Sequence, residues 1–293
     1  MQKDSLRLWI AASRPKTLTA GASPVIVASA IALRDDVFNL FIALNCLLVA
    51  ILFQITSNFI NEYIDFKKGA DTAERIGPQR AVSQGLISPK QMAIASWITV
   101  TIACLIGLYL AFSINLWLIV VGLLIAIFAY AYTGGPYPMA YNGLGDVCVI
   151  VFYGLIPVIF TYYVQSETIA TDVILSGLGV GIATTNILVA NNYRDYEEDK
   201  KHHKHTTIVI FGKRFGRAFY LSNGLLATGL FFYLLFSQNT LVAILPLAFI
   251  PLHISNFIRL KRAFSPDEKI AILGKTSIGV FLLSILFSIG ILI

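Results

Sequence analysis

Charged residues are scarce in this chain of 293 residues. Asp, Glu, Lys and Arg together make up 13% of it, against about 25% in soluble globular domains, whereas hydrophobic residues make up 57% and the mean hydropathy is +0.75. This scarcity excludes an ordinary soluble domain. We therefore expect an integral membrane protein whose apolar side chains face lipid.

Two further features are missing, namely cysteine pairs and a cleavable signal sequence. The three cysteines, Cys46, Cys104 and Cys148, each lie inside an apolar run, without the spacing of a metal site or a disulfide framework. We interpret them as small buried hydrophobes. The N-terminus has no short apolar core followed by a small-residue cleavage site, so we expect it to belong to the mature protein.

Long apolar runs are what the chain has instead. A membrane-spanning helix needs about 20 residues, so a chain of 293 residues has room for nine spans and short loops in one integral membrane domain, residues 1–293. The predicted fold class is all-α, a polytopic membrane protein with about nine transmembrane helices around a cytoplasm-facing cavity. The predicted spans cover residues 17–33, 39–64, 91–112, 114–132, 143–163, 171–193, 216–236, 240–259 and 270–293.

Positive charge is distributed very unevenly between the loops. Of the 22 Lys and Arg residues, all but Arg34 fall on one side of the predicted spans. Cytoplasmic loops carry such an excess, so we expect a multi-pass protein of the cell (inner) membrane with a cytoplasmic N-terminus and an external C-terminus. Anionic lipid and anionic substrates are sufficient partners for the net charge of +6, and no nucleic acid is implied.

Two acidic clusters lie at the cytoplasmic ends of predicted spans. The first follows span 39–64 and contains Asn58, Asn61, Glu62 and Asp65; the second follows span 171–193 and contains Asn191, Asn192, Asp195 and Asp199. Their spacing of three or four residues places each set on one helical face. Acids near the hydrocarbon edge are costly unless they are paired or functional. Solvation by headgroup water is the simpler alternative, which two such clusters on one membrane side disfavour.

Magnesium chemistry accounts for such a pair of clusters. Mg²⁺ prefers oxygen ligands and is usually held by one or two carboxylates together with substrate phosphate oxygens. The sequence therefore predicts facing clusters that hold Mg²⁺ around a diphosphate. The predicted clamp for the phosphate oxygens is basic and comprises Arg75, Arg80, Arg194, Lys200 and Lys204, although any one of these residues could serve only to set topology.

Other polar and aromatic residues near the same membrane face are candidates with simpler alternatives. Four tyrosines could stabilise a cation through their rings or form an interfacial aromatic belt; they are Tyr63, Tyr132, Tyr137 and Tyr193. Asp146 begins span 143–163, where it could orient a hydroxyl or act as a base. The histidines at 202, 203 and 205 have lysine neighbours and no cysteine beside them, which disfavours a zinc site.

These residues carry a resemblance to a known family. Asn58-x-x-Asn61-Glu62-Tyr63-x-Asp65 and Asn192-x-Arg194-Asp195-x-x-x-Asp199 resemble the two Asp-rich motifs of the UbiA superfamily of intramembrane aromatic prenyltransferases. The segments that resemble its dihydroxynaphthoate-prenylating branch are SRPKTLTAGASPV near the start, DTAERIGPQR at 71–80, YTGGPYP at 132–138, GLGD at 143–146 and TYYVQ at 161–165. The likeness extends to about residue 217.

The resemblance implies a reaction and a set of site residues. A polyprenyl diphosphate ionises with help from Mg²⁺, and its allylic carbon alkylates 1,4-dihydroxy-2-naphthoate with loss of carbon dioxide. The implied catalytic residues are Asn61, Asp65, Asp195 and Asp199. The implied metal ligands are these four with Asn58, Glu62 and Asn192, and the expected substrate-binding residues are Arg75, Arg80, Tyr132, Tyr137, Asp146, Arg194 and Lys204.

The sequence departs from the family pattern at two positions. Glu62 stands where the family usually has Asp, which puts its direct role in metal binding in doubt. His203 stands where a Gly usually precedes the lysine, whereas Lys204 and Thr206 keep their places.

Three alternatives stay open from the sequence. The acceptor could be 4-hydroxybenzoate, a haem or a chlorophyll precursor. A CDP-alcohol phosphotransferase would also use intramembrane Asp residues, but its Asp-Gly-x-x-Ala-Arg signature is missing. A cation transporter would place polar residues deep in several spans, whereas here they gather at one face.

Overall fold

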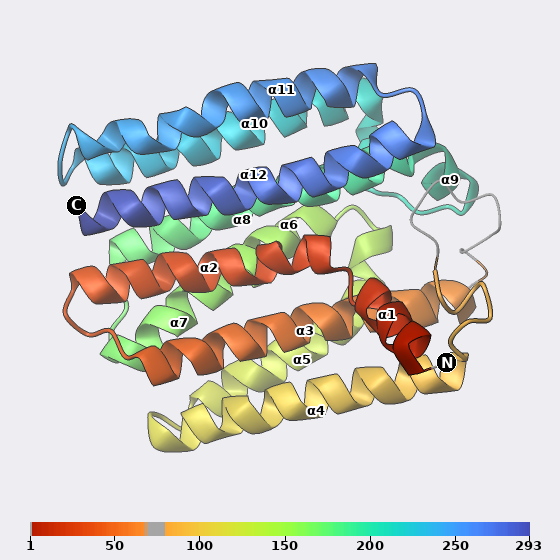
Figure 1. Cartoon of the computed structure of the whole chain (residues 1–293), viewed down its shortest axis with the longest axis horizontal. Helices are drawn as coiled ribbons and strands as arrows, with labels where there is room; N and C mark the ends of the chain where they lie inside the picture. The colour runs from red at the N-terminus through yellow and green to blue at the C-terminus, as the bar shows by residue number, and fades with distance from the viewer. Residues whose placement is uncertain (1, 68, 70–79) are drawn as a thin grey trace.

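The computed structural model consists of helices that run back and forth across one bundle, and it describes residues 2–67, 69 and 80–293 (Figure 1). The helices of the described residues are α1 (Gln2–Ala12), α2 (Pro15–Arg34), α3 (Leu40–Lys67), α4 (Pro89–Ser113), α5 (Leu118–Thr133), η1 (Met139–Tyr141), α6 (Gly145–Ile150), η2 (Val151–Leu155), α7 (Ile156–Ser166), α8 (Thr171–Arg194), α9 (Tyr196–Lys201), α10 (Thr207–Phe236), η3 (Val242–Ala248), α11 (Phe249–Arg262) and α12 (Pro266–Leu292).

The predicted spans correspond to these helices one by one. In the described part of the chain, eight helical segments are long and apolar enough to cross a membrane, with α6–α7 counting as one and η3–α11 as another. Span 114–132 corresponds to the shorter apolar helix α5, whose 16 residues extend about 24 Å at 1.5 Å per residue. The all-α multi-pass fold is confirmed, and the two termini lie at opposite ends of the bundle (Figure 1).

Capping residues determine where several helices begin. Proline occupies the first turn of α2, α4 and α12, where its missing N–H costs no hydrogen bond. Ser88 and Ser265 form capping boxes with Gln91 and Glu268, respectively. These local signals explain why the three helices begin two to four residues before the predicted spans, whose bounds follow hydropathy alone.

The start of α10 differs most from its prediction. The predicted span begins at residue 216, whereas α10 begins at Thr207, capped by the Thr206 hydroxyl, which accepts from the Val209 N–H at 3.3 Å. Gly212 interrupts the helix with a φ of 85°, a conformation that glycine adopts without steric cost. The turn before the kink is apolar, but Lys213, Arg214 and Arg217 follow it and lower the local hydropathy, so hydropathy places the start of the span only at residue 216.

The fifth span contains a π-helix, η2, between α6 and α7. Pro157 has no N–H to donate to the carbonyl four residues earlier, and such a gap is a usual cause of helical distortion. Gly154 in η2 packs so closely on α8 that a Cβ there would overlap the backbone of Gly177 and Gly181. Small residues therefore permit the near approach of the fifth span to α8.

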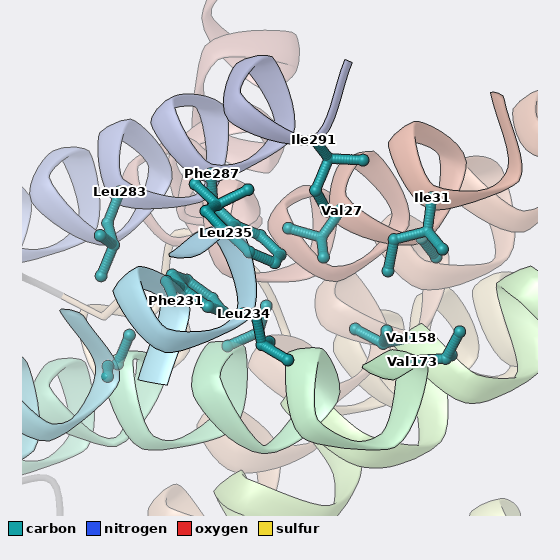
Figure 2. Packing of buried hydrophobic residues seen from close by; sticks show 14 of the residues in the cluster. Val27, Ile31, Val158, Val173, Phe231, Leu234, Leu235, Leu283, Phe287 and Ile291 are labelled. Carbon is teal, nitrogen blue, oxygen red and sulfur yellow. The ribbon is translucent and has the colours of Figure 1, made fainter. Parts of the chain in front are cut away.

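The tightest packing lies on one side of the bundle. A cluster of buried side chains joins α2, α7, α8, α10 and α12, and the rings of Phe231 and Phe287 stack there with centroids 4.0 Å apart (Figure 2). Of the α8 span 67% is buried, against 17% of the α3 and α4 spans. The bundle thus has a close-packed half and a half whose helices are less buried by one another.

An ion-pair cluster secures the end of the bundle where the chain leaves α2. Arg34 donates to both oxygens of Asp35 at 2.7 and 3.1 Å and to Asp172 at 2.7 Å, and the Tyr162 hydroxyl donates to Asp35 at 2.7 Å. The Arg34 guanidinium holds the pKa of Asp35 below its ordinary value. This cluster ties α2, α7 and α8 together at one end.

Candidate functional site

A cavity of about 800 Å³ lies among α2, α3, α4, α5, the fifth span and α8. Its lining residues on α3 extend from Cys46 to Asp65, a stretch of about 28 Å at 1.5 Å per residue. Most of the wall is apolar, with side chains such as Phe53, Phe128 and Phe160, whereas the acidic and basic residues gather at one mouth. The cavity therefore joins a charged entrance to a deep apolar chamber.

The first acidic cluster occupies the last turns of α3 at this mouth. Asn58, Asn61, Glu62 and Asp65 all line the cavity. The Asn58 amide donates to the Ser13 carbonyl at 2.9 Å, which joins α3 to the segment between α1 and α2. Asp65 accepts from Arg80 at 2.8 Å and from the Tyr141 hydroxyl at 3.3 Å.

The second acidic cluster is divided between α8 and α9. Asn192, Asp195 and Asp199 line the cavity, but the helix is interrupted at Asp195, so Asp199 belongs to α9. The expectation of one continuing helix is wrong here. Arg194 donates to both oxygens of Asp195, each at 2.6 Å, and Lys204 lies 3.3 Å from Asp199.

The structure brings the two clusters to the same mouth. Burial raises the pKa of Asp199, Lys204 opposes this rise, and the carboxylates of Asp195 and Asp65 add to it. Tyr141 also connects both sides, because its hydroxyl reaches Asp65 while Lys204 lies 5.6 Å from its ring centroid. Acids that are far apart in the sequence therefore influence one another's charge.

Glu62 holds a loop in place. Its side chain is 2% exposed and its Oε1 accepts from the Val82 backbone N–H at 3.0 Å. Ala81 and Val82 then pack with Phe59 and Met92 in a small apolar cluster beside α1. Glu62 therefore joins α3 to the loop that carries Arg80.

The donors at the mouth suit Mg²⁺ with a diphosphate better than an ion held by protein alone. Among the described residues, no three of His, Cys, Asp or Glu gather closely enough to form a metal site. Mg²⁺ needs only one or two carboxylates when phosphate and water complete its shell. The buried Asp199 Oδ2 and Arg194 Nη1 have no hydrogen-bond partner within the described part of the chain, so one can accept and the other donate.

Several predicted substrate-binding residues lie on the cavity wall and others lie elsewhere. Tyr132, Arg80, Arg194 and Lys204 line the cavity. Tyr137 is 61% exposed and lies outside the lining, as does Asp146, which is 7% exposed and accepts from the Thr207 hydroxyl. The roles of these two residues stay predictions. Arg75 lies outside the described residues.

Sequence reasoning missed several polar residues of the cavity, three of which are Tyr141, Gln54 and Tyr153. Tyr141 lies in η1, Gln54 lies on α3 and Tyr153 lies on the π-helix η2, and all three line the cavity. Gln54 precedes Asn58 by one helical turn, so the periodicity of the first cluster could have found it. No local signal marked Tyr141, since it reaches Asp65 only through the fold.

Comparison with known proteins places this arrangement among membrane prenyltransferases. The model of the UbiA prenyltransferase family matches residues 22–286. The 1,4-dihydroxy-2-naphthoate octaprenyltransferase of Haemophilus influenzae is 36% identical, over 100% of this chain and 98% of its own. The enzyme of that name from Escherichia coli is 35% identical, over 97% and 94%.

A solved structure shares the fold at low sequence identity. A UbiA homolog from Archaeoglobus fulgidus bound to GPP and Mg²⁺ superposes with a TM-score of 0.67 at 16% identity, covering 97% of this chain and 99% of the homolog. At this identity the likeness concerns the fold alone.

We predict that Glu62→Ala frees the loop that carries Arg80. A hydrogen bond to a charged acceptor contributes about 1.5–3 kcal/mol, so hydrogen–deuterium exchange over residues 80–88 should accelerate by about tenfold or more. Glu62→Gln keeps an acceptor oxygen without the charge and should accelerate exchange less than Glu62→Ala does. Glu197→Ala removes an exposed glutamate paired with Lys213 and is the matched control. Unchanged exchange in Glu62→Ala would show that the loop is held by other contacts.

Proposed function

Because the chain belongs to the UbiA prenyltransferase family, we propose that it transfers a polyprenyl chain from polyprenyl diphosphate to 1,4-dihydroxy-2-naphthoate. Carbon dioxide and diphosphate leave, and the product is demethylmenaquinol, a step of menaquinone biosynthesis. The names of the full-length relatives support this acceptor. The observation that carries the proposal is the meeting of two acidic clusters at the mouth of a deep apolar cavity.

The charged mouth binds the diphosphate. Asp65, Asp195 and Asp199, together with the amide oxygens of Asn58, Asn61 and Asn192, would hold Mg²⁺, which would supply positive charge to stabilise the departing diphosphate. The basic residues Arg80, Arg194 and Lys204 donate to the phosphate oxygens, and Arg75, which lies outside the described residues, keeps the same proposed role. Glu62 contributes by holding the loop that carries Arg80.

The walls below the mouth support the reaction itself. The allylic carbon–oxygen bond breaks, its electron pair leaves with the diphosphate, and a carbon–carbon bond forms to the naphthoate ring, which releases carbon dioxide. The allylic cation requires a site from which water is excluded. The ring of Tyr132 lines this part of the cavity and stabilises positive charge by about 0.5–2 kcal/mol.

We predict product formation with Mg²⁺, a polyprenyl diphosphate and dihydroxynaphthoate, and not with 4-hydroxybenzoate in its place. Asp65→Asn and Asp195→Asn remove charge without changing volume and should lower the rate by about 100-fold or more. Asp172→Asn, which breaks an ion pair at the other end of the bundle, is the control and should retain activity. Preference for 4-hydroxybenzoate in this acceptor panel would reassign the substrate, and full turnover by both site variants would remove these residues from the reaction.

The apolar chamber accommodates the prenyl tail. Gly107 on α4 and Gly122 on α5 both line it, and a Cβ at either position would meet open space. Thr133 is the one residue of α5 that is buried, so this helix separates the chamber from lipid. We infer that the tail extends past these glycines towards the lipid side.

We predict that Gly122→Trp discriminates between donors by length. A bulky ring in the chamber obstructs a long tail, at a cost of about 1–3 kcal/mol, so kcat/KM with octaprenyl diphosphate should fall by about tenfold or more. Geranyl diphosphate should be affected little. Gly229→Trp is the control, because Gly229 is exposed on α10 with open space around it. Equal loss with both donors would contradict this tail path.

We also propose that the mouth faces the cytoplasm, as the asymmetry of basic residues supports. In a variant without native cysteines, Ser83→Cys near the mouth should react with a membrane-impermeant maleimide only after cells are permeabilised. Ser237→Cys at the other end, which is also exposed, should react in intact cells. The reverse labelling pattern would invert the topology.

A further inference from the structure

Each aspartate at the mouth has a cationic partner in this structure. Arg80 pairs with Asp65 at 2.8 Å, Arg194 with Asp195 at 2.6 Å and Lys204 with Asp199 at 3.3 Å. The formal charges of these six groups sum to zero. The carboxylates that the proposed function assigns to Mg²⁺ are thus already neutralised by the protein.

Because the aspartates are already neutralised, the binding of a metal ion without diphosphate is unfavourable. An ion that binds Asp195 must displace a guanidinium whose side chain is 2% exposed, beside a carboxylate that is 7% exposed. A buried charge that loses its oppositely charged partner is strongly destabilised. A divalent cation that arrives without diphosphate therefore binds the carboxylate oxygens only by leaving basic side chains without a charged partner.

A diphosphate removes this obstacle. Its oxygens accept paired N–H groups from arginine as carboxylates do, so a displaced guanidinium finds a new partner within the same mouth. Arg194 is suited to this exchange, because its Nη1 is buried and without a hydrogen-bond partner among the described residues. Lys204 lies over the Tyr141 ring, which supports its ammonium group near both clusters.

We propose that Arg80, Arg194 and Lys204 are exchange cations, which neutralise the aspartates before the donor arrives and move to the diphosphate when it binds. Divalent-cation binding and diphosphate binding are then coupled, each strengthening the other by the same factor. This inference rests on the proposed function in that the mouth binds a diphosphate. It adds that the basic residues determine when the metal site opens.

The test measures Mn²⁺ binding to the full chain in lipid nanodiscs by equilibrium dialysis, with inorganic pyrophosphate as the second ligand. At matched free Mn²⁺, pyrophosphate should tighten Mn²⁺ binding to the wild type by about tenfold or more, a usual size for coupled sites. Arg80→Gln should bind Mn²⁺ alone about tenfold more tightly than the wild type, because Asp65 loses its competing cation, and should gain less from pyrophosphate.

Three further variants make the test specific. Arg80→Lys keeps the charge and should behave like the wild type, and Lys204→Gln repeats the test at Asp199 if Arg80→Gln does not fold. Arg34→Gln breaks a similar ion pair at the opposite end of the bundle and should leave Mn²⁺ binding unchanged.

Two results would overturn the inference. The first is an equal Mn²⁺ affinity of the wild type with and without pyrophosphate. The second is weaker Mn²⁺ binding by Arg80→Gln and Lys204→Gln than by the wild type when pyrophosphate is absent. The outcome is separable from that of the proposed function. Coupled binding without product formation would count against the reaction alone. Product formation with uncoupled Mn²⁺ binding would count against the exchange alone.

Discussion

The cost of placing carboxylates at the edge of the hydrocarbon region governs this structure. Asp195 and Asp199 are 6% and 7% exposed, and a buried carboxylate persists as an anion only if it is paired. The fold supplies cationic partners for Asp65, Asp195 and Asp199 from three separate places, namely the loop before α4, the last turn of α8 and the segment after α9. The site is therefore an assembly of the whole bundle, and neither acidic motif forms it alone.

Ion pairs between carboxylates and basic side chains occur at both ends of the bundle, but they serve different purposes there. At the far end, Arg34, Asp35 and Asp172 close on one another together with the Tyr162 hydroxyl, and the cluster joins three helices. At the mouth, Asp199 Oδ2 and Arg194 Nη1 keep unused hydrogen-bonding capacity among the described residues. A fully satisfied hydrogen-bond network makes a structure rigid. Unused donors and acceptors, by contrast, are available to bind a ligand that contains both a cation and an anion, such as Mg²⁺ with diphosphate.

Packing is divided in a corresponding way. The close-packed side of α2, α8, α10 and α12 (Figure 2) holds the second acidic cluster in position, and the contact of Gly154 with α8 fixes the fifth span against it. The helices α4 and α5 on the other side bury few residues and leave room in the cavity. A rigid frame for the charged groups and a loosely bounded chamber for an apolar tail are thus found in one bundle.

The sequence by itself determined the class of the protein, the order of its spans and the identity of its acidic clusters, because hydropathy and helical periodicity are local properties. It also indicated the family through its motifs. Local patterns misjudged the start of α10, where Gly212 allows a kink, and the continuity of α8, which ends at Asp195. Only the tertiary structure decided that Glu62 holds the loop at Val82 and that Tyr141 connects both clusters. It also decided which cation pairs with each aspartate, because these contacts join residues that are brought together by helix packing and that no spacing along the chain relates.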